Sequence, residues 1–341
     1  MGPRVPEPIS YSEWRPSGAS ISKRKNAILE NTETPTKRQK LNASEQVPST
    51  IGTVGQPFVN PRIVPVGFVW DSVDYSCGYD ATFTILANLW LENRARWSAN
   101  FTFLGTNLGS LGVNLQRVID RSFSLEQARD IIRRKMHSTH PALFPYGPNG
   151  TSIDRIADNL LPSHHYGNGR QHCPLCGFSD GKTYSILESA MSVTLDPSIE
   201  YPQGVTIQEW LNSVVSRGRG WCQRCRLRGV RSKLVMRTKF DSVSPLMIFS
   251  IDHARLKFNE YIIFDCNNLP VRLRLRGIIY GGQAHFTSRF VDKEGVMWFH
   301  DGITTASRCL EEVGYRSILD LLSLQRCGDK HAVAVVYAKE Y

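Results

Sequence analysis

The chain has no hydrophobic run that is long enough to cross a membrane. A membrane-spanning helix needs about 20 consecutive, mostly apolar residues, and polar or charged residues interrupt every stretch of that length. The first residues, Met1–Pro8, lack the apolar core of a signal peptide. Pro6 also stands where a myristoylation signal carries Ser or Thr. We therefore expect an intracellular protein with no membrane partner.

Aromatic residues and periodic patterns are scarce in residues 1–60. The segment is rich in Pro, Ser, Thr, Asn and Glu, a composition typical of disordered chains. It contains two basic clusters separated by eleven residues, Lys23-Arg24-Lys25 and Lys37-Arg38-Gln39-Lys40. This spacing is typical of a bipartite nuclear import signal, with a solvated charged tail as the alternative. We expect a disordered basic tail that a nuclear import receptor binds, nuclear localisation, and an ordered region over residues 61–341.

Disulfides are not expected in such a chain, although it has eight cysteines. Intracellular cysteines more often bind metals or act in catalysis. The clearest spacing is in two Cys-x-x-Cys pairs, Cys173/Cys176 and Cys222/Cys225, which 45 residues separate. Four thiolates suit tetrahedral zinc, so we expect one structural Zn²⁺ with the two pairs at the tips of separate hairpins. Two unrelated pairs, or a redox pair, are the alternatives.

The remaining cysteines and the nearby histidines give weaker signals. Cys266, Cys309 and Cys327 have no partner spacing, so we expect them to be packing residues. His164, His165 and His172 lie close to the first Cys-x-x-Cys pair in the sequence, and one of them could replace a thiolate.

Acidic residues are absent around the second cysteine pair, where the basic residues gather. The basic residues of this cluster are Arg217, Arg219, Arg224, Arg226, Arg228, Arg231, Lys233, Arg237 and Lys239. Such a cluster could bind the phosphates of a nucleic acid. It could equally be a solvated strand face, because Arg226 and Arg228 alternate with the apolar Leu227. Trp221 is the one aromatic residue there that a base could stack on.

Cys77 follows a polar, turn-prone stretch and precedes a helical apolar pattern. Phe83, Leu86, Leu89 and Trp90 recur at helical spacing after it. The thiol is therefore predicted at a helix N-terminus, where the helix dipole favours the thiolate. A small buried hydrophobic residue is the alternative interpretation.

His285 and Asp301 could complete a nucleophilic centre with this cysteine. Residues 285–290 alternate as a strand does, and Val296–Phe299 reads as its hairpin partner. Such a hairpin would bring Asp301, just past its end, back beside His285. A structural histidine and an Asp-Gly turn are the alternatives. The order Cys, His, Asp supplies the parts of a papain-type nucleophile.

Several segments in this order resemble the ubiquitin-specific proteases, which are papain-like cysteine peptidases. Ser76-Cys-Gly-Tyr-Asp-Ala81 is similar to their Thr-Cys-Tyr-Met-Asn box, and Ala284-His-Phe-Thr-Ser-Arg-Phe-Val291 to their Gly-His-Tyr segment. Trp298-Phe-His-Asp301 is similar to their Trp-x-x-Phe-Asp-Asp motif, and Leu246–Asp252 and His331–Tyr337 to their flanking strands. The Cys-x-x-Cys pairs lie where this family has zinc-binding fingers.

The resemblance implies an α+β fold with three parts. A helical thumb is expected from Cys77 to about Leu160, zinc-binding fingers over about 165–240, and a β-rich palm from about Pro245 to Tyr341. The expected activity is a thiol-dependent isopeptidase that removes ubiquitin or a ubiquitin-like modifier. Cys77 would be the nucleophile, His285 the base, and Asp301 the residue that orients the imidazole.

Two departures from the family pattern bear on activity. The position five residues before the cysteine, where the family often has an oxyanion-binding Asn, is Ser72, preceded by the acidic Asp71. Ser72 and the Cys77 amide are the expected oxyanion donors. Ala284 replaces the family's Gly before the His. A divergent member that acts on ubiquitin or a SUMO-like modifier is expected. The alternative is a catalytically inactive nuclear zinc scaffold that binds ubiquitin or nucleic acid.

Overall fold

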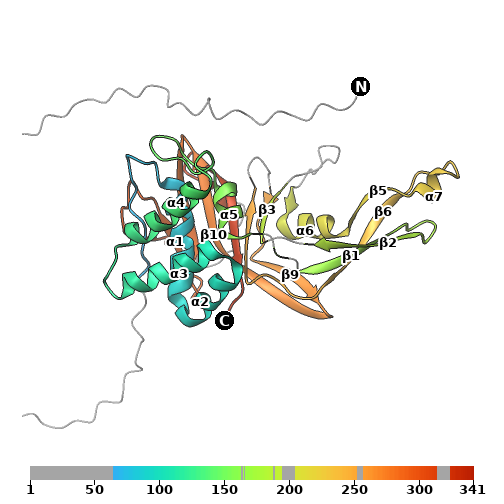
Figure 1. The fold of residues 1–341 in the computed structure, drawn as a ribbon, viewed down its shortest axis with the longest axis horizontal. Helices are drawn as coiled ribbons and strands as arrows, with labels where there is room; N and C mark the ends of the chain where they lie inside the picture. Colours follow the sequence, from blue (N-terminus) through green and yellow to red (C-terminus); the bar gives the residue numbers. More distant parts are fainter. Residues whose placement is uncertain are drawn as a thin grey trace, which may run out of the picture. The chain divides into compact units, whose positions relative to one another are not determined.

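Helices come first in the described chain, and strands dominate after them (Figure 1). The computed structural model describes residues 64–341, except 163, 165, 187–188, 194–203, 252–255 and 313–322. The predicted disordered tail and its import signal, within residues 1–60, lie outside the described residues. Residues 63–341 cluster as one compact unit.

The helical part is built around one buried helix. Its helices are α1 (Cys77–Glu92), α2 (Arg94–Leu104), α3 (Thr106–Ile119), α4 (Leu125–Thr139) and α5 (Ile153–Leu160). Every residue from Cys77 to Trp90 is buried, and a helix that is buried on all sides lies inside the core. The other helices flank it. Ser124 and Gln127 form a reciprocal capping box that fixes the start of α4.

The second part of the described chain contains the strands, two further α-helices and one 3-10 helix. Its elements are β1 (Gly167–His172), β2 (Ser179–Ile186), β3 (Ala190–Ser192), β4 (Val205–Thr206), α6 (Ile207–Ser216), β5 (Arg217–Trp221), α7 (Gln223–Arg226), β6 (Lys233–Phe240), β7 (Leu246–Ser250), β8 (Leu256–Lys257), β9 (Tyr261–Cys266), β10 (Leu269–Gly282), β11 (His285–Val291), β12 (Met297–His300), β13 (Leu310–Glu311), η3 (Ser323–Gln325), β14 (Arg326–Cys327) and β15 (Lys330–Ala338). The predicted combination of helices and a sheet is confirmed.

The long strand β10 organises the sheet. Its first half, Leu269–Arg274, pairs with β9, and its second half, Gly277–Gly282, pairs with β11. β15 pairs along the opposite edge of this second half. Among the described residues the sheet has 13 strands, with a main path β13-β12-β11-β10-β9-β6-β1-β2. Most pairs are antiparallel, whereas β3–β7 and β6–β9 are parallel.

The strands β7 and β15 bury both of their faces. Successive side chains of a strand point to opposite faces, and β7 and β15 are apolar at almost every position. One face joins the core that contains α1 and α5, and the other joins the core that contains α6. The first face includes Leu246, Ile248, Ala334 and Val336, and the second includes Met247, Phe249, Val335 and Tyr337. The sheet is therefore a rigid support for α1 and for its first residue, Cys77.

Two hairpins, β1–β2 and β5–β6, extend away from helices α1–α5, and α7 lies at the tip of the second hairpin (Figure 1). β1 joins them by pairing with β6 from Gly167↔Phe240 to His172↔Val235. The hairpin ends are therefore side by side. Among the described helices, none combines the length and the apolarity needed to span a membrane.

Candidate active site and metal centre

Cys77 is the first residue of α1, as its sequence context predicts, but its thiol is not exposed. Only 5 % of the residue is accessible, and the backbone N–H of Phe286 donates a hydrogen bond to its sulfur. Burial raises the pKa of Cys77 to about 11, and the nearby carboxylate of Asp80 adds to the rise. The predicted thiolate is therefore wrong for the resting protein. Loss of hydration, to which the charge of Asp80 adds, outweighs the backbone hydrogen bonds to the sulfur, which lower the pKa.

His285 and Asp301 meet through the predicted hairpin. β11 pairs with β12 in a register that sets Ser288 opposite His300, and this brings Asp301 to the start of β11. The Nε2 atom of His285 lies 2.8 Å from Oδ1 of Asp301. Because Phe286 contacts Cys77 and follows His285 directly, the same strand end holds the imidazole segment against the thiol.

The Asp301 carboxylate is held in its charged form. Burial alone would raise its pKa, but hydrogen bonds from His285 and from the backbone N–H of Ile303, at 2.9 Å, outweigh burial. The pKa of Asp301 is therefore well below its usual range. A charged carboxylate on Nε2 leaves Nδ1 as the imidazole nitrogen that can exchange a proton with another group.

Trp70 packs against this pair and was missed by the sequence reasoning. Its ring lies edge-on to the imidazole of His285, with 6.3 Å between centroids. Its backbone N–H donates to the carbonyl of Gly302, next to Asp301. A side chain on Gly302 would collide with this segment, since a Cβ there would lie 2.9 Å from the Phe68 carbonyl oxygen. No local sequence pattern signals these contacts, because residues 70 and 285 meet only in the folded chain.

A buried ion pair anchors the first turn of α1. Nη1 of Arg129, on α4, lies 2.8 Å from Oδ1 of Asp80, and each side chain is only 2 % accessible. Ser76 joins them: its hydroxyl donates to Asp80 at 2.6 Å and accepts from Arg129 at 3.1 Å. Burial raises the pKa of Asp80 to about 7, although Arg129 and Ser76 both favour its charged form. This network fixes the residues on either side of Cys77.

Asp71 and Ser72, the residues predicted to lie near the oxyanion, come just before Cys77. Ser72 is exposed, in the turn over residues 72–75, and its hydroxyl has no recorded hydrogen bond in the part of the chain that the structure describes. Burial would raise the pKa of Asp71, but the backbone N–H groups of Val73 and Asp74 donate to its carboxylate and lower it. The charged carboxylate of Asp71 is therefore stabilised by backbone N–H groups of the turn that follows it.

The four cysteines of the two Cys-x-x-Cys pairs come together at the ends of the hairpins. Their sulfur atoms all lie within 4.8 Å of one another. The Cys173–Cys225 and Cys176–Cys222 sulfur pairs are 3.6 and 3.7 Å apart. A tetrahedron with Zn–S bonds of about 2.3 Å has edges of about 3.8 Å. The cluster can therefore hold one metal ion, and its dimensions fit zinc.

Among the described residues, the remaining cysteines, His164 and His172 do not join this cluster, and His165 lies outside the described residues. In the part of the chain that the structure describes, all eight cysteines are free thiols. Cys266, Cys309 and Cys327 pack against the two main cores, as predicted. His164 instead contacts the carbonyl of Leu104 through Nε2 at 2.9 Å.

No family model matches this chain, and no curated protein matches its sequence. It is similar to solved structures at 11 % identity. One, a SAGA Ubp8 DUB module with Sgf11, Sus1 and Sgf73, has a TM-score of 0.45 and covers 86 % of this chain and 71 % of that chain. Another, bound to ubiquitin aldehyde, has a TM-score of 0.43 and covers 83 % and 72 %. A yeast SAGA DUB module has a TM-score of 0.42 and covers 81 % and 68 %. At these scores the likenesses carry no functional conclusion.

Proposed function

We propose that this protein is a cysteine peptidase that cleaves the bond between the C-terminus of a ubiquitin-like modifier and a lysine amine. The observation that carries the proposal is the 2.8 Å contact between His285 and Asp301, on the strand end that also contacts the Cys77 sulfur. The choice of modifier depends on the resemblance of the Cys77, His285 and Asp301 segments to the ubiquitin-specific proteases.

The first half of the reaction transfers the modifier to the enzyme. His285 takes the thiol proton as the sulfur attacks the carbonyl carbon of the modifier's last residue. The bond to the lysine nitrogen then breaks, and the imidazolium gives its proton to the leaving amine. Because burial raises the pKa of Cys77 to about 11, the base has to act during the attack. Asp301 holds the imidazole with Nδ1 toward the thiol.

The second half releases the modifier. His285 takes a proton from water as the water oxygen attacks the thioester carbonyl, and the imidazolium then gives this proton to the leaving Cys77 sulfur, which restores the thiol. The modifier's new carboxylic acid releases its own proton to solvent and becomes a carboxylate. The backbone N–H of Cys77 and the Ser72 hydroxyl are the proposed oxyanion donors in both halves. Loss of one such donor typically costs on the order of 100- to 1,000-fold in rate. Ser72 would have to turn inward when substrate binds.

The architecture fits a thumb, palm and fingers division in this proposal. The helices α1–α5 would form the thumb, the sheet around β10 the palm, and β1, β2, β5 and β6 the fingers. Cys173, Cys176, Cys222 and Cys225 would hold one structural zinc. Four thiolates fill the coordination sphere, which leaves no position for an activated water.

The test is turnover of a fluorogenic ubiquitin or SUMO C-terminal reporter by the purified protein. Cys77→Ala and His285→Ala should abolish turnover, and Cys266→Ala, a buried cysteine of the other core, is the matched control and should retain it. Wild-type turnover by Cys77→Ala would reject the assignment.

A second candidate is a non-catalytic zinc scaffold. The observations that favour it are the raised pKa of Cys77 and the exposed position of Ser72. In that case the wild-type protein would bind the modifier without cleaving either reporter, and Cys77→Ala would not change binding.

Nuclear import through Lys23–Lys40 is also proposed, from the sequence alone. The 38.5 kDa chain could diffuse through nuclear pores, so the test uses a bulky fluorescent tag. Neutralising Lys23, Arg24, Lys25, Lys37, Arg38 and Lys40 together should leave the fusion cytoplasmic. Unchanged nuclear accumulation would reject the import signal.

A further inference from the structure

The β5–β6 hairpin and α7 carry a positive surface that no acidic residue compensates. Eight of its basic side chains are exposed: Arg217, Arg224, Arg226, Arg228, Arg231, Lys233, Arg237 and Lys239. The sequence has no Asp or Glu from Trp210 to Phe240. In the part of the chain that the structure describes, none of the eight forms an ion pair with a carboxylate. We call these eight residues the basic fingertip.

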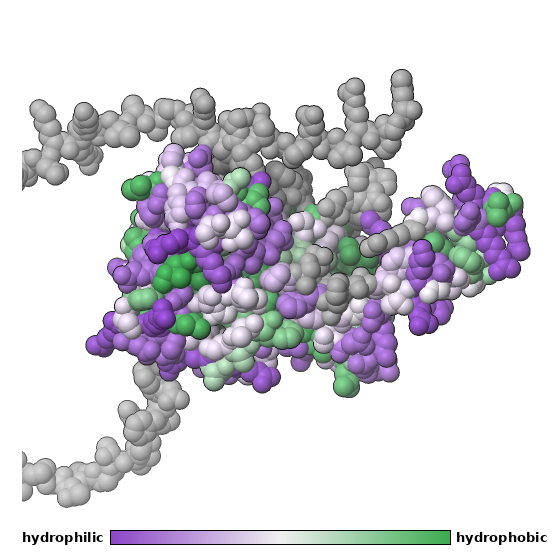
Figure 2. Space-filling view, in the orientation of Figure 1, coloured by the Kyte–Doolittle hydropathy of each residue, from purple (hydrophilic) through white to green (hydrophobic). Residues whose placement is uncertain are grey.

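The neighbouring hairpin does not neutralise this charge. Asp180, on β2, accepts hydrogen bonds from Tyr184 at 2.6 Å and from Gln171 at 3.2 Å, within its own hairpin. Figure 2 shows that hydrophilic residues dominate the surface over α7 and the adjoining strand ends, with a small hydrophobic group at the tip. Such a concentration of positive charges is mutually repulsive, and it attracts polyanions.

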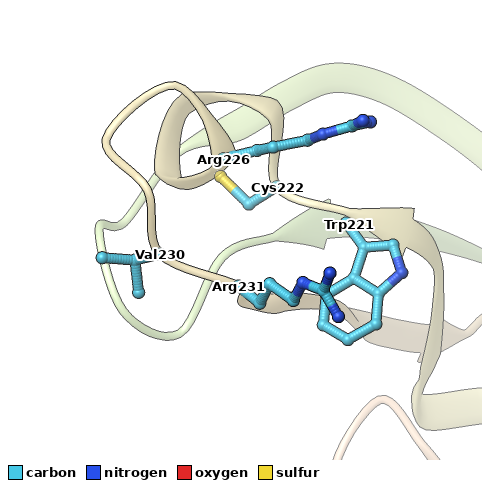
Figure 3. A pocket seen from close by; sticks show the side chains of 5 residues that line it. All are labelled: Trp221, Cys222, Arg226, Val230 and Arg231. Atoms are coloured by element: carbon cyan, nitrogen blue, oxygen red, sulfur yellow. The ribbon is translucent and has the colours of Figure 1, made fainter.

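A pocket lies within the basic fingertip. It has a volume of about 330 Å³ and is lined by Trp221, Cys222, Arg226, Val230 and Arg231 (Figure 3). Trp221 is 50 % exposed, which is unusual for so large an apolar ring. Nζ of Lys233 lies 5.5 Å from its ring centroid. The pocket therefore combines one flat aromatic surface with two guanidinium groups.

The cluster of four cysteines adjoins this pocket. Cys222 lines the pocket and belongs to the cluster of four sulfurs. Its backbone N–H donates to the carbonyl of Ser232, and the N–H of Val230 donates to the carbonyl of Cys225, at 3.0 Å. The pocket side chains thus extend from a short loop whose two ends are hydrogen-bonded, and a preorganised loop binds at a lower entropic cost.

We propose that this pocket binds single-stranded nucleic acid. One base stacks on Trp221, and the phosphates on either side of it contact Arg226 and Arg231. The other basic fingertip residues attract the strand. An acidic polypeptide would complement the positive charge of the basic fingertip, but it has no flat ring that could stack on the indole of Trp221. A duplex hides the faces of its bases, whereas base stacking on aromatic residues is the usual device of single-strand binding. The proposal does not depend on peptidase activity.

The test is fluorescence anisotropy of a labelled mixed-sequence DNA oligonucleotide with the full-length protein, over a series of salt concentrations. Trp221→Ala should weaken binding on the order of 10- to 100-fold. Arg226→Gln combined with Arg231→Gln should flatten the slope of log affinity against log salt by about 1.4, since each single-strand phosphate contact contributes about 0.7. The same oligonucleotide as a duplex should bind more weakly.

Matched controls separate the pocket from general charge. Arg94→Gln with Arg134→Gln removes two exposed charges from α2 and α4 and should leave affinity and salt slope unchanged. The basic clusters within residues 23–40 also attract phosphates, but every variant carries them equally. Zinc content and thermal melting establish that each variant is folded.

Three outcomes would overturn the proposal. The first is a Trp221→Ala variant that binds the single strand as tightly as wild type. The second is a control pair that flattens the salt slope as much as the pocket pair. The third is poly-L-glutamate that displaces the oligonucleotide at equal residue concentration, which would identify an acidic polypeptide as the partner instead. Loss of reporter cleavage with binding intact would reject only the peptidase.

Discussion

Asp80 and Arg129 form an ion pair at 2.8 Å, one helical turn from Cys77, and each of the two side chains is only 2 % accessible. Breaking such a pair from one side leaves a buried charge without a partner, which typically costs about 3–5 kcal/mol. We expect Arg129→Met to lower the free energy of unfolding by about that amount, as measured by urea denaturation.

The matched control is Asp130→Asn. Asp130 also contacts Arg129 at 2.8 Å, but its side chain is 40 % exposed, so its removal should cost less than about 1 kcal/mol. The double change Asp80→Asn with Arg129→Met should be less destabilising than Arg129→Met alone, because no charge remains buried. Equal, small effects of Arg129→Met and Asp130→Asn would contradict this account of the pair.

The same pair predicts the sign of a pH effect. Folding raises the pKa of Asp80 from 3.8 to about 7, so the folded protein retains a proton that the unfolded chain has released. The contribution of protonated Asp80 to stability is complete below pH 3.8 and is lost as the pH rises toward about 7. Without Arg129 the loss should be larger, so Arg129→Met should be relatively more destabilised in alkaline buffer than in mildly acidic buffer. The reverse order in denaturation curves would contradict the shift.

The thiol of Cys77 should titrate at high pH. Burial raises its pKa to about 11, and only the thiolate reacts with iodoacetamide. The alkylation rate of Cys77, followed by mass spectrometry of its peptide, should therefore rise about tenfold for each pH unit below this pKa. The peptide that carries Cys309 provides a second, partly buried thiol for comparison. A rate that is already constant at neutral pH would instead indicate a preformed thiolate–imidazolium pair.

Trp70 should act as a positioning residue for the imidazole. Its ring packs edge-on to His285, and small misplacements of a catalytic group can cost about 100-fold in rate. Trp70→Ala should lower kcat of reporter cleavage by roughly 10- to 100-fold with little change in KM. Trp70→Phe keeps an aromatic edge and should retain most of kcat. Equal losses in both variants would show that the ring contact is not the cause.

Removal of one metal ligand should unfold the hairpin ends. A structural zinc contributes folding free energy directly, so Cys222→Ser should lower both bound zinc and thermal stability. Cys327→Ser, which removes a thiol outside the cluster, is the control and should keep the full metal content. Metal analysis that finds no zinc in a fully folded wild-type protein would contradict the site.

The parts of the site that adjacent strands bring together could be predicted from sequence. The hairpin β11–β12 is local, so alternation and the intervening turn were enough to predict that Asp301 lies beside His285. The doubled Cys-x-x-Cys spacing likewise predicted the cluster of four sulfurs at the tips of two hairpins. In both cases short-range patterns carry the information.

The parts that depend on burial could not be predicted. Asp80 and Arg129 are 49 residues apart, and no local pattern links them. The helix start at Cys77 was visible in the sequence, but the burial that raises the pKa of Cys77 exists only in the folded chain, where distant elements such as β11 pack against α1. Trp70 lies 215 positions before His285 in the sequence, and the packing of residues 67–70 against 300–302 brings them together.

The most direct measurement is the site of covalent labelling by ubiquitin and SUMO probes that carry an electrophile at the C-terminus. The account predicts one adduct, mapped by peptide mass spectrometry to Cys77, that forms with at least one of the two probes. The adduct should be absent in Cys77→Ala and strongly slowed in His285→Ala. Labelling of another cysteine, or no labelling of a folded, zinc-loaded protein by either probe, would contradict the proposed peptidase.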